Sequence, residues 1–436
     1  MTDLAQQKQP IGLGLIFLNG FSFSILGTLF LVPGAASIPT LMTLLASASV
    51  LATPHARTSL IHLFTHRDSR WIAWPFLIWP IGSMLIAGIS PSGLFDDFPH
   101  LQLRFVFALS LLALSLLIKP RPSWLLWSLP FAAMLAAAHA GYSIFVEALP
   151  RAQAWGAKGM NPIYFGNWSM MIAVLIVIIS ALATSLSTYL RIGLLVTATL
   201  AAWASLASGS RSSLFALGAL FPMLLLLRKD KFHRLLVFFI LGFIALFALI
   251  SFNSTTVQRH LRLDSAAQDI AQLRENNHVT SIGTRIVIWQ AAWSIFKDHP
   301  FTGIGSDGFK REYLRMMEAK EIPAAEVHSQ AHSDLLQAMV SRGLVGLLSY
   351  VLVIIGPLIF FTLALRRAAD NENMRLYAAC GLLVVSVTFL FNLTNANFVS
   401  KISSMTYPLL ICAFAAQVML SSVDNFKPIA QRKEHA

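Results

Sequence analysis

The sequence predicts an all-α protein that crosses a membrane about twelve times and carries one helical domain outside the membrane, between the ninth and tenth spans. Two bulk properties support this fold class. Of the 436 residues, 56% are hydrophobic and only 12% are charged, and the mean hydropathy is +0.66. Soluble domains carry about twice this share of charged residues. The third observation is the distribution of the apolar residues, which form long runs interrupted by a single large polar segment.

A helix needs roughly 20 consecutive apolar residues to cross about 30 Å of hydrocarbon. The runs that reach or approach this length are Ile11–Val32, Ser37–Ala52, Trp71–Ile89, Leu101–Ile118, Trp124–Val146, Phe165–Leu182, Ile192–Ala207, Ser212–Leu227, Leu235–Phe252, Leu344–Leu365, Leu376–Phe391 and Met405–Leu420. They predict four parts. Spans 1 to 9 occupy 1–252, the polar segment occupies 253–343, spans 10 to 12 occupy 344–422, and a tail occupies 423–436. We call the segment 253–343 the island.

Lysine and arginine collect in every second connection, which predicts the orientation of the spans because positively charged short loops resist translocation. The connections expected on the inside hold Arg57, Arg67, Arg70, Lys119, Arg121, Arg228, Lys229, Lys231, Arg234, Arg366, Arg367 and Arg375, and the tail adds Lys427, Arg432 and Lys433. Both termini are therefore expected in the cytoplasm and the island on the outer side.

The formal net charge of +12 does not indicate a nucleic-acid partner. The island contains ten Lys or Arg and ten Asp or Glu residues, so it has no basic arm. The excess cations belong to the expected cytoplasmic face, where they suit anionic membrane lipids. The sequence also lacks a Walker-type or dinucleotide-binding glycine motif, so ATP-driven transport has no support.

Two helices are expected in the island. Apolar residues recur at helical spacing over 284–296, and Lys297-Asp298-His299-Pro300 should end that helix. A second helix is expected from about Ser329 to Arg342, with Gly343 as its stop. In that helix His332 and His328 would share one face.

His332 is the candidate catalytic base, because an imidazole can take a proton from a sugar hydroxyl near neutral pH. The alternative is a histidine that only satisfies hydrogen bonds inside the domain, and for His328 this structural reading leads. Two histidines at i and i+4 can also hold Zn²⁺, but no third ligand has suitable spacing. The expectation is therefore a site without a metal or another cofactor.

Two arginines are candidates for binding a phosphate group. Arg211 follows Ser208-Gly209-Ser210 at the expected outer start of a helix, where the helix dipole disfavours a cation. Free backbone amides, the hydroxyl of Ser210 and a guanidinium make this position a good anion site. Arg285, at the start of the first island helix, is interpreted in the same way. The alternative for both is an arginine that reaches toward lipid headgroups.

Secondary candidates lie before the sixth span, in a segment expected on the outer side. Asn161 and Tyr164 could contact a sugar or pyrophosphate, although a role in starting the helix explains them nearly as well. Lys158 adds positive charge just before them. Gly303 and Gly305 are expected in tight turns.

Several motifs, taken in order, resemble the O-antigen ligase family. They are Ser208-Gly209-Ser210-Arg211, Arg285 with Trp289, His299-Pro300-Phe301-Thr302-Gly303-Ile304-Gly305, and His332-Ser333-Asp334-Leu335-Leu336-Gln337 running into Arg342-Gly343-Leu344-Val345-Gly346-Leu347. The resemblance covers about residues 161–348. This family includes O-antigen polymerases and bacterial protein O-oligosaccharyltransferases.

The resemblance implies a membrane glycosyltransferase of GT-C type, without cofactor, in the inner membrane of a Gram-negative bacterium. The outer side, with the island and the active site, would then face the periplasm. The donor would be O-antigen linked to undecaprenyl pyrophosphate, and the acceptor a sugar hydroxyl of lipid A-core. Arg211 and Arg285 would bind the pyrophosphate, while His332 would deprotonate the acceptor with inversion at the anomeric carbon. O-antigen polymerase and protein O-oligosaccharyltransferase activities remain alternatives. A polysaccharide transporter would instead place ionisable residues inside the spans.

Overall fold

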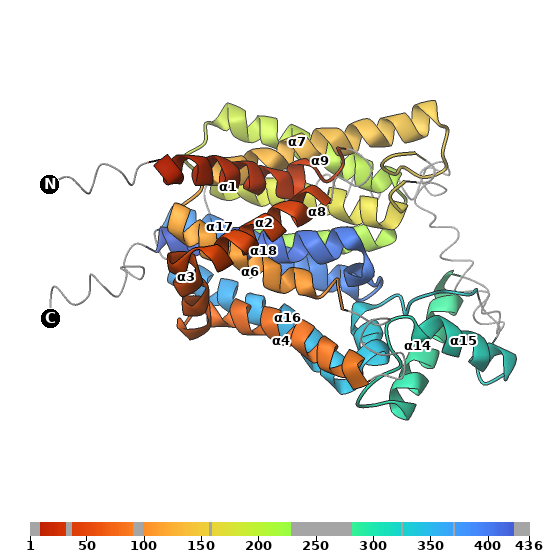
Figure 1. Cartoon of the computed structure of the whole chain (residues 1–436). Helices are drawn as coiled ribbons and strands as arrows, with labels where there is room; N and C mark the ends of the chain where they lie inside the picture. The colour runs from red at the N-terminus through yellow and green to blue at the C-terminus, as the bar shows by residue number, and fades with distance from the viewer. Residues whose placement is uncertain are drawn as a thin grey trace, which may run out of the picture.

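The computed structural model describes residues 9–31, 37–89, 99–156, 159–227, 281–323, 326–368 and 371–422. Within these ranges every regular element is helical (Figure 1). Ahead of the island the elements are α1 (Gln9–Gly27), α2 (Ser37–Ala52), α3 (Pro54–Thr65), α4 (Arg70–Ile89), α6 (Leu103–Ile118), α7 (Pro122–Gly141), η1 (Tyr142–Val146), α8 (Pro162–Leu182), α9 (Thr188–Ala207), η2 (Arg211–Leu214) and α10 (Phe215–Leu227). The remaining ones are α14 (Ser281–Asp298), α15 (Gly308–Glu318), α16 (Asp334–Arg367), α17 (Glu372–Asn392), η3 (Asn397–Val399) and α18 (Lys401–Ser421).

The expected fold class, an all-α polytopic membrane protein, is confirmed. Among the described residues, seven helices are long and apolar enough to span a membrane, or eight if one bent pair forms a single span. Three shorter apolar helices cover 13–27, 103–118 and 211–225. The expected span Leu235–Phe252 lies outside the described residues. The count of twelve spans, the GT-C assignment and the domain boundaries therefore stay predictions.

One expected cytoplasmic connection is a helix. The sequence predicted a turn after Ala52, whereas α3 follows α2 directly and is bent from it by 103°. Pro54 opens α3, and Thr53 before it has an extended backbone. The ring of a proline disfavours helical geometry in the preceding residue, which explains why the chain turns sharply here and then resumes a helix.

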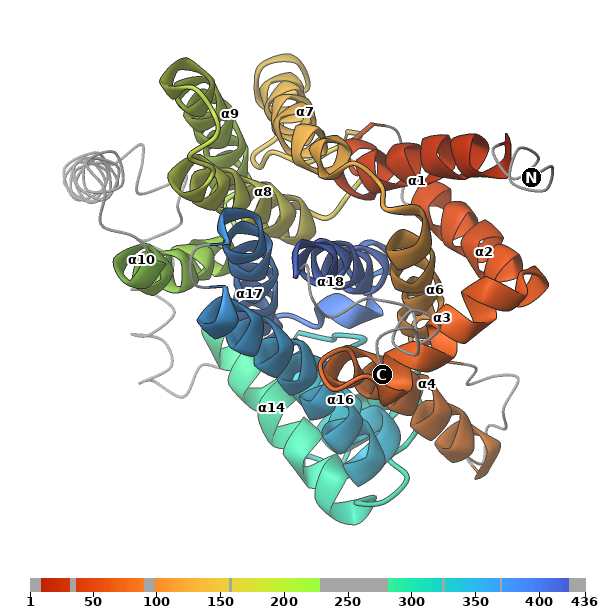
Figure 2. The same ribbon diagram turned by 90° about the vertical axis from the view of Figure 1, so that its left-hand side faces the viewer.

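The helices form a bundle around α18, which Figure 2 shows at the centre. α18 packs against α17, α6 and α1, and almost all of its residues are buried. Its Tyr407 hydroxyl donates a hydrogen bond of 3.0 Å to the carbonyl of Val353 on α16, so the polar group is satisfied inside an apolar interior. α8 is similarly enclosed, with α9, α7, α17 and α10 as neighbours.

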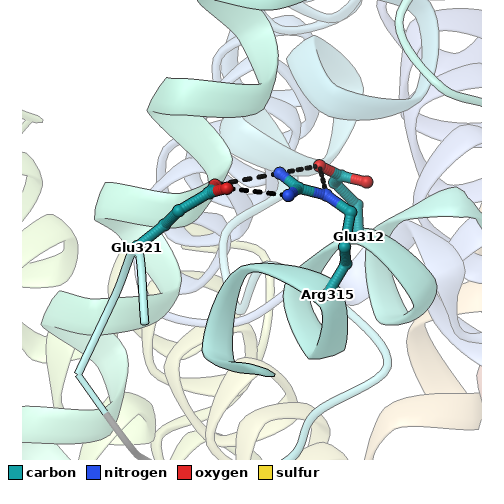
Figure 3. A network of polar contacts seen from close by, with 3 residues as sticks. All are labelled: Glu312, Arg315 and Glu321. Carbon is teal, nitrogen blue, oxygen red and sulfur yellow. Dashed lines mark hydrogen bonds and ion pairs between the residues drawn. The ribbon is translucent and has the colours of Figure 1, made fainter. Parts of the chain in front are cut away.

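The described part of the island lies at one end of this bundle (Figure 1). α14 and α15 share a small core of their own, centred on Ile288, Ile295, Phe309 and Tyr313. On the surface, Arg315 joins Glu312 and Glu321 in an exposed ionic network (Figure 3). An exposed network of this kind contributes little to stability, so the buried apolar contacts hold the two helices together.

The second island helix differs from its prediction at one end. The break at Gly343 is confirmed, because this residue has φ 58° and ψ −143° inside α16. The predicted start at Ser329 is wrong, since α16 begins at Asp334. The Gln337 side chain accepts the backbone N–H of Ala331 at 2.8 Å, which satisfies that amide outside a helix. His332 therefore precedes α16, and the expected placement of His328 and His332 on one face of this helix is wrong.

The loop 299–305 forms hydrogen bonds with α16 on both sides of the break at Gly343. Ile304 N–H donates to Val340 O at 2.8 Å, and Leu344 N–H donates to Pro300 O at 2.7 Å. A Cβ on Gly303 would lie 2.3 Å from Val340 O, and one on Gly343 would lie 2.5 Å from Pro300 O. Both glycines have positive φ, as does Gly305, so their expected role in tight turns is confirmed. These contacts hold the two parts of α16, before and after Gly343, against the same loop.

Candidate active site

The loop between α9 and α10 holds Arg211 at the first position of η2. The hydroxyls of Ser210 and Ser212 both bond to Asn167 Oδ1 on α8, at 3.3 and 2.9 Å. This buried network ties the loop to α8 at the point where Arg211 begins the short helix. Ser210, a secondary candidate for phosphate binding, thus has its hydroxyl engaged in holding the loop.

Arg285 lies in the first turns of α14, close enough to Arg211 for their charges to interact. Burial lowers the pKa of Arg285, and the neighbouring charge of Arg211 lowers it further. Two guanidinium groups held near each other at a half-buried position repel. An anion between them would relieve that repulsion, as a pyrophosphate does at arginine-rich sites.

His332 lies within electrostatic reach of the same Arg285. The pKa of His332 is lowered to about 4, first by burial and then by the charges of His328 and Arg285, while Asn395 opposes the shift. The imidazole is therefore neutral at pH 7 and able to accept a proton. Its backbone has φ 49°, in the left-handed region that few residues other than glycine adopt. Such strained positions concentrate at functional sites.

His328 and His332 contact each other through their rings. His332 Nε2 lies 3.0 Å from His328 Nδ1, and His328 Nε2 lies 3.6 Å from a carboxylate oxygen of Glu326. When His332 Nε2 carries the proton and donates to His328, its Nδ1 keeps a lone pair. Within the described residues that Nδ1 atom is buried and makes no hydrogen bond of ordinary geometry, although the Asn395 side chain interacts with the ring. Nδ1 is therefore the candidate proton acceptor.

Asp334, two residues after His332, fastens the island to the bundle. Its buried carboxylate accepts the backbone N–H groups of Asn397 and Phe398 at distances from 2.8 to 3.1 Å. A buried carboxylate is costly unless hydrogen bonds satisfy it, and here the donors come from η3, between α17 and α18. No role was predicted for Asp334, because the residues next to it in the sequence do not indicate that its hydrogen-bond partner, Asn397, lies more than sixty residues away.

A cavity of about 610 Å³ lies between the island and the bundle. His332 does not line it, but residues close to His332 in the sequence do. Its wall includes Gln330 and Asp334 from the His332 segment, and Gln337 and Arg342 from α16. Arg342 is 2% exposed and donates to the Ser306 hydroxyl at 3.3 Å. Arg342 was quoted in a motif but was not a site candidate, since a cation just before a helix break reads as a cap of the helix end.

The secondary candidates fall in different places. Tyr164 lines the cavity, and its hydroxyl donates to the carbonyl of Ala396 at 3.3 Å. Asn161 caps α8, its side-chain oxygen accepting Ile163 N–H at 2.8 Å, so helix entry accounts for it. Lys158 lies outside the described residues. His328 is joined to His332 as described above.

No group of three or more His, Cys, Asp or Glu side chains within the described ranges is arranged to hold a metal ion. The two cysteines, Cys380 and Cys412, are both buried and unpaired. A catalytic site without metal stays the prediction, and the histidine pair is treated below as an acid–base group.

Comparison with known proteins identifies the region around these residues. Residues 195–351 match the family model described as O-antigen ligase, which includes Arg211, Arg285 and His332. The expected resemblance to the O-antigen ligase family is confirmed over this region. An uncharacterized protein of Haemophilus influenzae is 27% identical over 206 residues, which are 46% of this chain and 50% of that protein. The chain thus spans about half the length of the curated relative it matches.

Proposed function

We propose, on the basis of the O-antigen ligase domain at residues 195–351, that this membrane protein is a glycosyltransferase that moves O-antigen from undecaprenyl pyrophosphate to a sugar hydroxyl of lipid A-core. Membership of this domain family supports ligase-type or polymerase-type activity in general. One observation supports the proposed position of the catalytic site. Arg285 interacts electrostatically with both Arg211 and His332, so three segments distant in sequence converge.

In this mechanism the two arginines bind the pyrophosphate of the donor. The acceptor oxygen attacks the anomeric carbon of the O-antigen while His332 Nδ1 takes the hydroxyl proton. The bond between the anomeric carbon and the phosphate oxygen breaks, and undecaprenyl pyrophosphate leaves with its extra negative charge stabilised by Arg211 and Arg285. A single displacement of this kind inverts the anomeric centre. Protein groups that stabilise developing charge are commonly the largest contribution to such a rate.

The low pKa of His332 in the free protein fits an order of events. Burial contributes most to the low pKa of His332, followed by the charges of His328 and Arg285, and a bound pyrophosphate would cancel only the contribution of Arg285. The pKa of His332 would then rise when the donor is present, which strengthens the base at the moment that it is needed. His328, hydrogen-bonded to Nε2, keeps Nδ1 in the form that accepts the proton.

The direct test is transfer by the purified full chain in lipid nanodiscs. Undecaprenyl-pyrophosphate-linked O-antigen is supplied as donor, with lipid A-core, a second donor glycan or a candidate protein as acceptor. We expect product on lipid A-core. Glycan elongation on the carrier instead would identify a polymerase, and product on protein alone an O-oligosaccharyltransferase. A deletion strain gives the matching phenotype, in which a ligase defect leaves long O-antigen on the lipid carrier.

A further inference from the structure

We infer that the cavity of about 610 Å³ between the island and the bundle is a saccharide-binding site that holds the acceptor glycan. The inference rests on the proposed function and names the substrate of the same centre. The cavity volume lies within the range of about 300–1,000 Å³ typical of small-molecule sites. Neither Arg211 nor Arg285 belongs to its wall, so the cavity is distinct from the expected pyrophosphate position.

The chemistry of the wall suits a sugar. Partly exposed amide side chains come from Gln102 and Gln330, and these offer both donors and acceptors to hydroxyl groups. The exposed carboxylate of Asp307 and the exposed hydroxyl of Ser329 add further acceptors and a donor. Dense groups of both hydrogen-bonding types in one concave wall match a polyhydroxylated ligand better than an acyl chain.

Aromatic side chains form the apolar part of the same wall. Trp79 and Phe398 line the cavity, and their ring centroids are 5.4 Å apart. Behind them Phe105 lies 4.7 Å from Trp79 and 5.6 Å from Phe398. Such packing holds the rings in fixed positions. The exposed edges of these fixed rings can contact the apolar face of a sugar ring while its hydroxyls bond to the polar groups of the same wall.

Contacts in the wall also connect the cavity with the candidate base. Tyr164 lines the cavity and interacts with the side chains of Gln330 and Asn395. Asn395 in turn interacts with His332. His332 thus interacts with Arg285, the expected contact of the donor, and through Asn395 it is linked to Tyr164 in the cavity wall. In the proposed reaction His332 takes the proton of a hydroxyl group that a glycan held in the cavity extends toward the donor.

Thiol protection tests this site without requiring turnover. The two native cysteines are completely buried, so Ser306→Cys in the exposed cavity wall introduces an accessible thiol. Glu312→Cys on the exposed face of α15 is the matched control outside the cavity. The full chain in nanodiscs is labelled with a polar maleimide alone, with purified lipid A-core, with its delipidated core oligosaccharide, or with undecaprenyl-pyrophosphate-linked O-antigen.

We expect lipid A-core and the core oligosaccharide to slow labelling of the Ser306→Cys variant at least fivefold and to leave the Glu312→Cys variant unchanged. Protection by the donor alone would assign the cavity to the donor glycan and overturn the inference. Equal protection by donor and acceptor, or by neither, would overturn it as well. Protection persists even if no transfer is detected, so failure of the proposed reaction is distinguished from failure of the binding site.

A kinetic comparison adds a second readout when transfer is detected. Gln102→Met keeps the length of a cavity side chain but removes its amide. We expect the KM for the acceptor to rise about fivefold, the ordinary effect of one lost hydrogen bond, with the KM for the donor within twofold of the wild type. A rise confined to the donor KM, or no change in either KM, contradicts an acceptor site here.

Discussion

Replacing Arg285 by glutamine should separate binding of an anionic substrate from a role in folding. Burial and the charge of Arg211 both lower the pKa of Arg285, which means that the fold disfavours its charge. Glutamine removes that charge. We therefore expect the melting temperature of Arg285→Gln to equal or exceed that of the wild type, because the repulsion from Arg211 is lost.

Activity should change in the opposite direction. Charge-assisted hydrogen bonds to a leaving group contribute about 2–4 kcal/mol to the stabilisation of a transition state, which corresponds to roughly a thirtyfold to thousandfold loss of kcat/KM. Arg211 remains in the variant, so we expect the loss to lie toward the lower end. Arg285→Lys should recover little, since an ammonium lacks the planar pair of donors.

The assay measures initial transfer rates and thermal unfolding on the same purified protein in nanodiscs. Lys297→Gln is the matched control, because Lys297 is an exposed cation on the same helix and should leave both quantities unchanged. Wild-type activity in Arg285→Gln would refute the role in substrate binding. An activity loss that parallels a lower melting temperature would show that Arg285 supports the fold.

The remaining predictions concern the other parts of the site and the topology. Arg211→Lys should lose tens- to a thousandfold in rate at a normal protein level, and full activity of Arg211→Ala would exclude the proposed contact. His332→Ala should fold and bind the donor, yet its transfer rate should fall about a hundred- to ten-thousandfold. His328→Ala should keep substantial activity. Inhibition of the wild type by a chelator would instead indicate that both histidines bind a metal ion. Because His332 must be neutral to act and its pKa is about 4, kcat/KM should fall only as the pH drops toward 4, and His328→Gln should move this acid limb to higher pH by removing a charge that lowers the pKa. Reporters fused at Lys320 and at the C-terminus should report opposite sides of the membrane, and a shared side would contradict the predicted orientation.

Local patterns in the sequence were sufficient to predict where most of the described helices lie and where several of them end. Apolar runs of about 20 residues report lipid-facing or buried helices whatever their neighbours are, because hydrocarbon leaves no other way to satisfy the backbone. Gly343 marked the break in α16 for an equally local reason, since its φ of 58° suits glycine and few other residues. The motifs around Arg211, Arg285 and His332 were also sufficient to predict the resemblance to the O-antigen ligase family, whose model matches residues 195–351.

The conformation of His332 depended on contacts that periodicity does not record. Apolar spacing predicted a helix through His332, but the amide of Ala331 is satisfied by the Gln337 side chain and Asp334 bonds to the amides at Asn397 and Phe398. One bond within the segment and two bonds to a distant segment therefore accompany the start of α16 after the histidine.

The cavity was decided entirely by tertiary structure. Its wall draws Trp79, Gln102, Arg342 and Phe398 from four distant segments, and none of them forms a recognisable motif with another. The sequence by itself determined which groups are able to carry charge and protons. Only the packing of the island against the bundle decided which of them meet, because hydrogen bonds and aromatic contacts between segments far apart in the chain leave no local periodic signal.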